Sequence, residues 1–223
     1  YMVRANKVAD SVKLQARVDD IAKGAALMTG TSYDRVFIDG TAELLPNYTL
    51  EKLMHGCFEE VGVPKCTAEE LEYAAALKAT YSPERDVPGI GAKFDAGIAK
   101  QVKALSENMT KPVYDFLMPQ YSGEGFRPGS TDVGDVSWQT PTAQIEVAAW
   151  PAGVPGHSWQ VVACGKSSMA HKAMLCAGKV IASAAIELLE QPALLEKAKS
   201  EFKERSASGY VCPIEPDAVP IAL

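Results

Sequence analysis

Residues 127–159 read RPGSTDVGDVSWQTPTAQIEVAAWPAGVPGHSW and combine a small-residue turn, two aspartates and a histidine framed by proline and glycine. Gly129, Ser130 and Thr131 are small, polar residues that let backbone N–H groups approach an anion, and glycine permits dihedral angles that other residues resist. His157 follows a rigid, sharply bent approach that is typical of a loop. This stretch therefore predicts an anion-binding turn and an exposed imidazole.

Three strings in this region carry a family resemblance: GSTDVGDVSW at 129–138, HSWQ at 157–160 and AHKAM at 170–174. They resemble the C-terminal half of the M20 family of metal-dependent amidohydrolases and peptidases, in its aminobenzoyl-glutamate hydrolase branch. The resemblance covers residues 1 to about 204. The last segment, 208–223, reads SGYVCPIEPDAVPIAL and carries no signal.

The predicted fold class is α/β. Residues 1–5 and 33–39 read as strands on either side of a helix at 8–28, with Gly30 as its C-cap. The resemblance implies that residues 1–45 are the tail of a ferredoxin-like α+β lid, which mediates dimers in many relatives. It also implies that residues 46–223 are the C-terminal part of the catalytic α/β domain.

Local signals place the remaining elements. Thr49 is expected to cap a helix, Thr67 and Glu70 form a capping box, and Pro192 begins a final helix. Short apolar runs with flanking turn residues predict buried strands. The expected strands are 143–150 and 159–164, and the other expected helices are 92–109 and a helix capped by Ser167 or Ser168 that ends near Leu189.

Composition excludes several classes of protein. The formal charge is −6 with a pI near 5.2, and no basic block with interleaved aromatic residues is present, so nucleic acid is not an expected partner. No apolar stretch reaches the roughly 20 residues that span a bilayer. Five cysteines without C-x-x-C spacing indicate reduced thiols in the cytoplasm. Because Tyr1 is not a translation start, we expect further sequence upstream.

His157 by itself makes no metal site, since catalytic zinc needs three protein ligands. The resemblance implies that it completes a centre of two divalent ions, Zn or Mn, whose other ligands and general-base glutamate come from the N-terminal half of the enzyme. The sequence has no second cluster of His, Asp and Glu to supply them. We therefore expect this chain alone to be inactive.

Other polar residues are assigned by the same resemblance. It implies that Arg4 clamps the free carboxylate of a small-molecule substrate and that the turn at Gly129 and Ser130 receives the same group. His171 is predicted to orient ligands or contact substrate. Asp132, like Asp135, is expected to orient the histidine or its loop. His55 is predicted to be solvated on a polar helix face.

The implied reaction is hydrolysis of an amide bond next to an amino-acid carboxylate, in aminobenzoyl-glutamate-like substrates, other N-acyl amino acids or dipeptides. Serine hydrolysis is not supported, because Ser130 lies outside a G-x-S-x-G elbow. Cys164 falls in an apolar run and is expected to be buried. The alternative that stays open is a non-catalytic binding or interaction module derived from the same fold.

Overall fold

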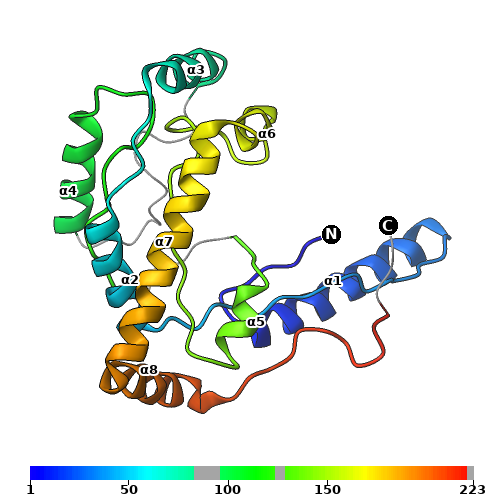
Figure 1. Ribbon diagram of the computed structural model, residues 1–223. Coiled ribbons are helices and arrows are strands. Elements are labelled where there is room, and N and C mark those ends of the chain that lie inside the picture. Colours follow the sequence, from blue (N-terminus) through cyan, green and yellow to red (C-terminus); the bar gives the residue numbers. More distant parts are fainter. Residues whose placement is uncertain (83–95, 124–128, 220–223) are drawn as a thin grey trace. The chain divides into compact units, whose positions relative to one another are not determined.

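The computed structural model describes residues 1–82, 96–123 and 129–219. Over these residues the chain is helical, with eight α-helices, one short 3-10 turn and no strand (Figure 1). The helices are α1 (Val8–Thr29), α2 (Tyr48–Val61), α3 (Ala68–Lys78), α4 (Ala96–Glu107), α5 (Val133–Ser137), α6 (Trp159–Gly165), α7 (Ser168–Glu190) and α8 (Pro192–Arg205).

The chain forms two compact units. The first comprises Tyr1–Asn47, Pro128–Thr142 and Lys199–Leu223, and the second comprises Tyr48–Arg127 and Ala143–Ala198. Residues 129–142, which carry the whole GSTDVGDVSW string, thus belong to the same unit as α1. The assignment of residues 1–45 to a lid domain and of 46–223 to a catalytic domain stays a prediction.

Helix α1 is the longest element of the first unit. It ends at Gly30, which has a φ of 65°, and this confirms the predicted left-handed C-cap. At its other end the first backbone N–H, that of Val8, donates to the Glu43 carboxylate at 3.0 Å. Lys7 lies 3.5 Å from the second oxygen of the same carboxylate. An acid far along the chain therefore caps the helix, where the helix dipole also favours negative charge.

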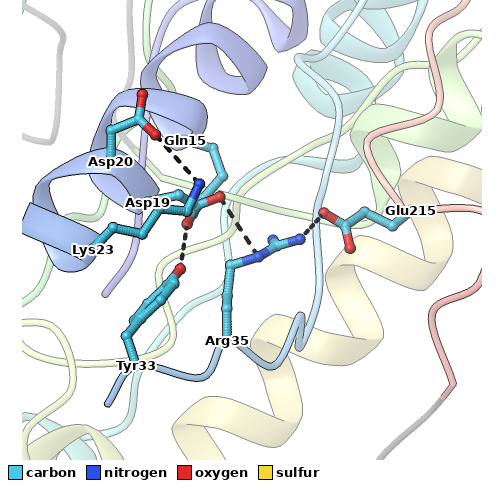
Figure 2. Close-up of polar contacts among 7 residues, drawn as sticks. All are labelled: Gln15, Asp19, Asp20, Lys23, Tyr33, Arg35 and Glu215. Atoms are coloured by element: carbon cyan, nitrogen blue, oxygen red, sulfur yellow. Dashed lines mark hydrogen bonds and ion pairs between the residues drawn. The ribbon is translucent and has the colours of Figure 1, made fainter. Parts of the chain in front are cut away.

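Asp19, in the middle of α1, contacts side chains of its own helix and of the segment that follows it (Figure 2). Gln15 and the Tyr33 hydroxyl donate to its Oδ1 at 2.9 and 3.2 Å, and Arg35 Nε lies 3.6 Å from its Oδ2. Arg35 also donates to Glu215. The segment that follows α1 and the C-terminal segment are both held by side chains of this cluster.

The strands predicted at 1–5 and 33–39 are not present. Both segments are irregular, since a strand is stable only when a neighbour pairs with its backbone N–H and C=O groups, and the part of the chain that the structure describes offers none. The α/β class is therefore only partly matched: the helices form, but neither a sheet nor an α+β lid is confirmed.

In the second unit α7 packs against α2 (Figure 1). Their contact is a buried apolar cluster, to which irregular residues of the 143–150 segment add Ile145 and Val147. The buried members are Cys57, Phe58, Cys176, Val180 and Ala184. The strand predicted at 143–150 is therefore wrong, since the segment is irregular, although Ile145 and Val147 pack against the core.

A second cluster joins α3, α6 and the start of α7 through Ala74, Leu77, Val113, Cys164 and Met169. Cys164 is fully buried, as predicted, and burial raises the pKa of its thiol. A thiol that resists ionisation is a poor nucleophile.

The strand predicted at 159–164 is wrong, because these residues form α6. Ser158 is the N-cap, with extended backbone and with its Oγ accepting from Val161 N at 3.4 Å. A short apolar run has the same composition in a buried strand as in a helix. The preceding serine favours the helix, because its side chain can cap the first turn.

Most predicted helix boundaries agree with the structure. The Thr67–Glu70 capping box opens α3, Ser167 caps α7, and Pro192 begins α8. Helix α2 begins at Tyr48, so Thr49 lies inside its first turn. Residues 92–95 of the helix predicted at 92–109 lie outside the described residues. None of the described helices is both long and apolar enough to cross a membrane.

Candidate functional site

The candidate site residues divide between the two units. Arg4, Gly129 and Ser130, the predicted carboxylate-binding residues, belong to the first unit, whereas His157 and His171 belong to the second.

His157 lies in the loop before α6 and is exposed. Its φ is 54°, and among the described residues other than glycine it alone has a positive φ. A non-glycine residue in the left-handed region costs on the order of 1 kcal/mol and persists where its surroundings fix it. The next residue, Ser158, is the N-cap of α6, so the backbone of His157 lies directly before the start of this helix.

Two other histidines differ in environment. His171 lies in the first turn of α7 and is exposed, with its backbone N–H donating to Ser167 O at 3.1 Å. His55 was predicted to be solvated, and this is wrong: its side chain is only 19% exposed, and its Nε2 lies 2.9 Å from the carbonyl oxygen of Met118. The irregular segment after α4 covers this face of α2, which the polar neighbours of His55 did not indicate.

Gly129 and Ser130, where the anion-binding turn was predicted, have irregular backbone and are exposed, as binding of an anion requires. Gly129 does not have a positive φ, and a Cβ placed on it would meet nothing within 4 Å. Gly129 therefore does not use the dihedral freedom that glycine has, and its role in binding an anion stays a prediction. Thr131 ties the turn to α5, since its Oγ1 accepts from Val133 N at 3.3 Å and its carbonyl accepts from Gly134 N at 3.0 Å.

Arg4 is exposed in the segment before α1, and its guanidinium lies 3.6 Å from the sulfur of Met2. This contact is weak, because a thioether sulfur is a poor acceptor. An exposed guanidinium with five N–H donors can add a carboxylate to the contacts it already makes. The role of Arg4 in binding a substrate stays a prediction.

The two aspartates of the motif differ. Asp132 is exposed at the N-cap position of α5 and makes no capping hydrogen bond there. Asp135 is half-buried and uses both oxygens: Oδ2 accepts from Ala42 N at 3.1 Å and Oδ1 from the Tyr210 hydroxyl at 2.8 Å. Tyr210 lies in the C-terminal segment that carried no signal in the sequence.

The described residues do not form a metal centre of their own. Across residues 1–82, 96–123 and 129–219 no group of three or more His, Cys, Asp and Glu side chains could hold a metal ion. His157 therefore offers at most one ligand, and a metal site would need further ligands from elsewhere.

Comparison with known proteins supports the resemblance seen in the sequence. The chain is 34% identical over 225 residues to one of the subunits of p-aminobenzoyl-glutamate hydrolase from Escherichia coli (strain K12). The alignment covers all of this chain and 47% of the relative, so the chain spans about half of that protein's length. No family model and no solved structure matches the chain. Along its whole length the chain is thus similar to a hydrolase subunit of the branch that residues 129–138 predicted.

Proposed function

We propose that this chain is part of a metal-dependent hydrolase that cleaves an amide bond next to an amino-acid carboxylate. The substrates would be aminobenzoyl-glutamate, other N-acyl amino acids or dipeptides. The observation that carries the proposal is the similarity over the whole chain to a hydrolase subunit. The chain would work in the cytoplasm, where its free cysteines stay reduced.

In this proposal His157 provides one ligand to a centre of two divalent ions, Zn or Mn. Neutral imidazole suits either ion. Two features support the assignment: the side chain is exposed, and its backbone is held in a conformation that costs free energy. The described residues supply no further ligands, so the rest of the centre would come from the N-terminal half of the enzyme.

Arg4 and the turn at Gly129 and Ser130 would bind the free carboxylate of the substrate. A guanidinium fork matches the two oxygens of a carboxylate, and exposed backbone N–H groups add donors without a competing charge. All three residues belong to one compact unit. Binding the acid end would hold the scissile amide at a fixed place.

The N-terminal half of the enzyme is the proposed main partner, and the second unit has a surface that suits it. Helix α7 is apolar on both sides: one side packs against α2, and the other exposes large apolar side chains, as does α6. Helices that are apolar all round are normally covered on all sides. The exposed side chains are Trp159 and Val162 on α6, and Met174, Leu175, Ile181, Ile186 and Leu189 on α7. A homodimer formed through residues 1–45 is a further proposed contact.

The proposal is tested in the complete enzyme, meaning this chain joined to its N-terminal half. The assay is kcat/KM for p-aminobenzoyl-glutamate and for the analogue in which the α-carboxylate is a carboxamide. Replacing Arg4 with alanine should cost about 2 to 5 kcal/mol on the acid and little on the carboxamide. Arg4→Lys should be nearly as damaging, because lysine lacks the planar fork.

A matched control is Arg17→Ala, which removes an exposed arginine of the same unit and should leave both substrates unaffected. Equal losses on the acid and the carboxamide after Arg4→Ala would show that Arg4 acts on folding. A wild-type enzyme without amide hydrolase activity would contradict the proposed function itself.

The second candidate function is a non-catalytic binding module of the same fold. The observation that favours it is the lack of a metal-ligand group among the described residues. The coding sequence upstream of Tyr1 discriminates between the two functions. A histidine-containing metal motif with a Glu-Glu pair there supports the enzyme, and its absence supports the binding module.

A further inference from the structure

Helix α5 holds two segments that are far apart in the sequence, residues 42–45 and the C-terminal segment that carries Tyr210. Asp135 is the centre of this arrangement, because each of its carboxylate oxygens binds a different segment. Oδ2 accepts from the backbone N–H of Ala42 at 3.1 Å, and Oδ1 accepts from the hydroxyl of Tyr210 at 2.8 Å. This hydrogen bond raises the pKa of Tyr210 well above its usual range, so the hydroxyl stays a donor at neutral pH.

The same helix binds the backbone after Ala42 at two more points. Ser137 is 1% exposed; its Oγ accepts from Leu45 N at 2.8 Å and donates to Gly134 O at 2.5 Å. Trp138 Nε1 donates to the carbonyl of Glu43 at 2.9 Å. Side chains of the motif thus form hydrogen bonds with the backbone of residues 42–45, which has no strand neighbour in the described part of the chain.

Close packing fixes the distance between α5 and residues 42–45. A Cβ on Gly134 would lie 2.1 Å from the carbonyl oxygen of Ala42, so only glycine fits. On the other side the rings of Trp138 and Tyr210 lie with their centroids 6.5 Å apart. Helix α5 is therefore fixed between residues 42–45 and the C-terminal segment.

The position of the turn at Gly129 and Ser130 depends on the position of α5. Thr131 is bound to the first turn of α5 by its hydroxyl and by its carbonyl oxygen. Ser130 and Gly129 directly precede it in the chain. A shift of α5 would therefore move the backbone N–H groups of the turn.

We propose that Asp135 is a positioning residue, which fixes the Gly129–Ser130 turn where the substrate's carboxylate binds by holding Ala42 and Tyr210. This inference rests on the proposed function, because it needs that turn to bind the carboxylate. The proposal gives the C-terminal segment a role, since the hydrogen bond from Tyr210 is one of the two anchors of Asp135; the other is the hydrogen bond from Ala42 N. Binding groups must be held within about 0.5 Å of their working geometry, so a looser α5 weakens binding of the acid.

The test uses the complete enzyme, with p-aminobenzoyl-glutamate and its α-carboxamide analogue as probes. Asp135→Ala removes both anchors and should raise KM for the acid about tenfold, with a smaller change in kcat and little change on the carboxamide. Asp135→Asn should recover most of the loss, because an amide can accept from Ala42 and donate to the Tyr210 oxygen. A general loss of folded enzyme would instead lower kcat equally for both probes.

Tyr210→Phe removes one anchor with little change of shape and serves if Asp135→Ala does not fold. It should raise KM for the acid about threefold. The double variant should have the same KM as Asp135→Ala, because the hydrogen bond is already lost in that variant. The control is Asp217→Ala, an exposed acid of the same C-terminal segment, which should match wild type.

Two results distinguish the positioning role of Asp135 from the proposed hydrolase function. A wild type that prefers the acid, with Asp135→Ala and Tyr210→Phe keeping that preference and the wild-type KM, overturns the positioning role and leaves the proposed function standing. A wild type that hydrolyses neither probe overturns both.

Discussion

Replacing Glu70 with glutamine should destabilise the chain strongly and in a pH-dependent way. Glu70 is 7% exposed and accepts from Thr67 N at 2.6 Å, from Ser168 Oγ at 2.6 Å and from Lys172 Nζ at 2.7 Å. The bond from Lys172, followed by those from Ser168 and Thr67, lowers the pKa of Glu70 from 4.5 to about 2. These contacts join the start of α3 to the start of α7.

The size of the effect follows from this pKa. A group ionised in the folded chain down to about pH 2, but only to about pH 4.5 when unfolded, contributes about 3 kcal/mol at pH 7. We expect about 2 to 3 kcal/mol, because the Lys172 side chain is 37% exposed and water screens part of the interaction. The pKa is lowered on folding, so the contribution is complete above pH 5, less than half by pH 3, and lost near pH 2.

Urea unfolding of wild type and Glu70→Gln at pH 7, 5 and 3, followed by tryptophan fluorescence, measures this difference. The matched control is Glu69→Gln, which removes the same charge from the same helix turn at an exposed position. Its cost should stay below about 1 kcal/mol. A Glu70→Gln cost that equals the control, or that is the same at pH 7 and pH 3, would contradict a stabilising role of the ionised Glu70 carboxylate.

Three further predictions concern packing, capping and metal binding. Gly134→Ala should lower the free energy of unfolding by about 3 kcal/mol or more, because its Cβ would overlap the Ala42 carbonyl, whereas Gly129→Ala should leave the thermal midpoint nearly unchanged. Ser158→Ala should cost about 1 kcal/mol in urea unfolding through loss of the α6 cap, and no loss would show that the cap is unimportant. The dialysed 223-residue chain should retain little divalent metal by elemental analysis, and two tightly bound ions per chain would contradict this.

Local signals predicted the helices well. The capping box at Thr67 and Glu70, the glycine at position 30 and the proline at position 192 each act within one helix turn, so the sequence alone is sufficient to find them. The capping box, however, gave no sign that Glu70 also binds Ser168 and Lys172, about a hundred residues further along the chain.

Strand predictions failed because a strand depends on a partner. The residue patterns at 33–39 and 143–150 indicate side chains that can be buried, but they do not indicate whether a neighbouring strand is present to pair with them. At 159–164 the apolar run was ambiguous, and the serine at position 158 was the signal that could have identified the helix.

The supporting contacts of the candidate site were not predictable from spacing. Tyr210 binds Asp135 across 75 residues, in a segment whose composition resembles a terminal tail. The tryptophan at position 138 was the one indication, since a Trp with its N–H buried needs an acceptor nearby, and here it is the Glu43 carbonyl. The sequence identified the motif, but it did not identify the residues that pack against it.

The metal content of the complete enzyme with His157→Gly tests the proposed metal role most directly. Glycine adopts a φ of 54° without strain, so the substitution removes the imidazole and keeps the loop. We predict that the variant loses at least one bound ion per chain and its hydrolase activity, while its metal-free form unfolds at the same temperature as metal-free wild type or slightly higher. Full metal content and activity in the variant would contradict the assignment of His157 as a metal ligand.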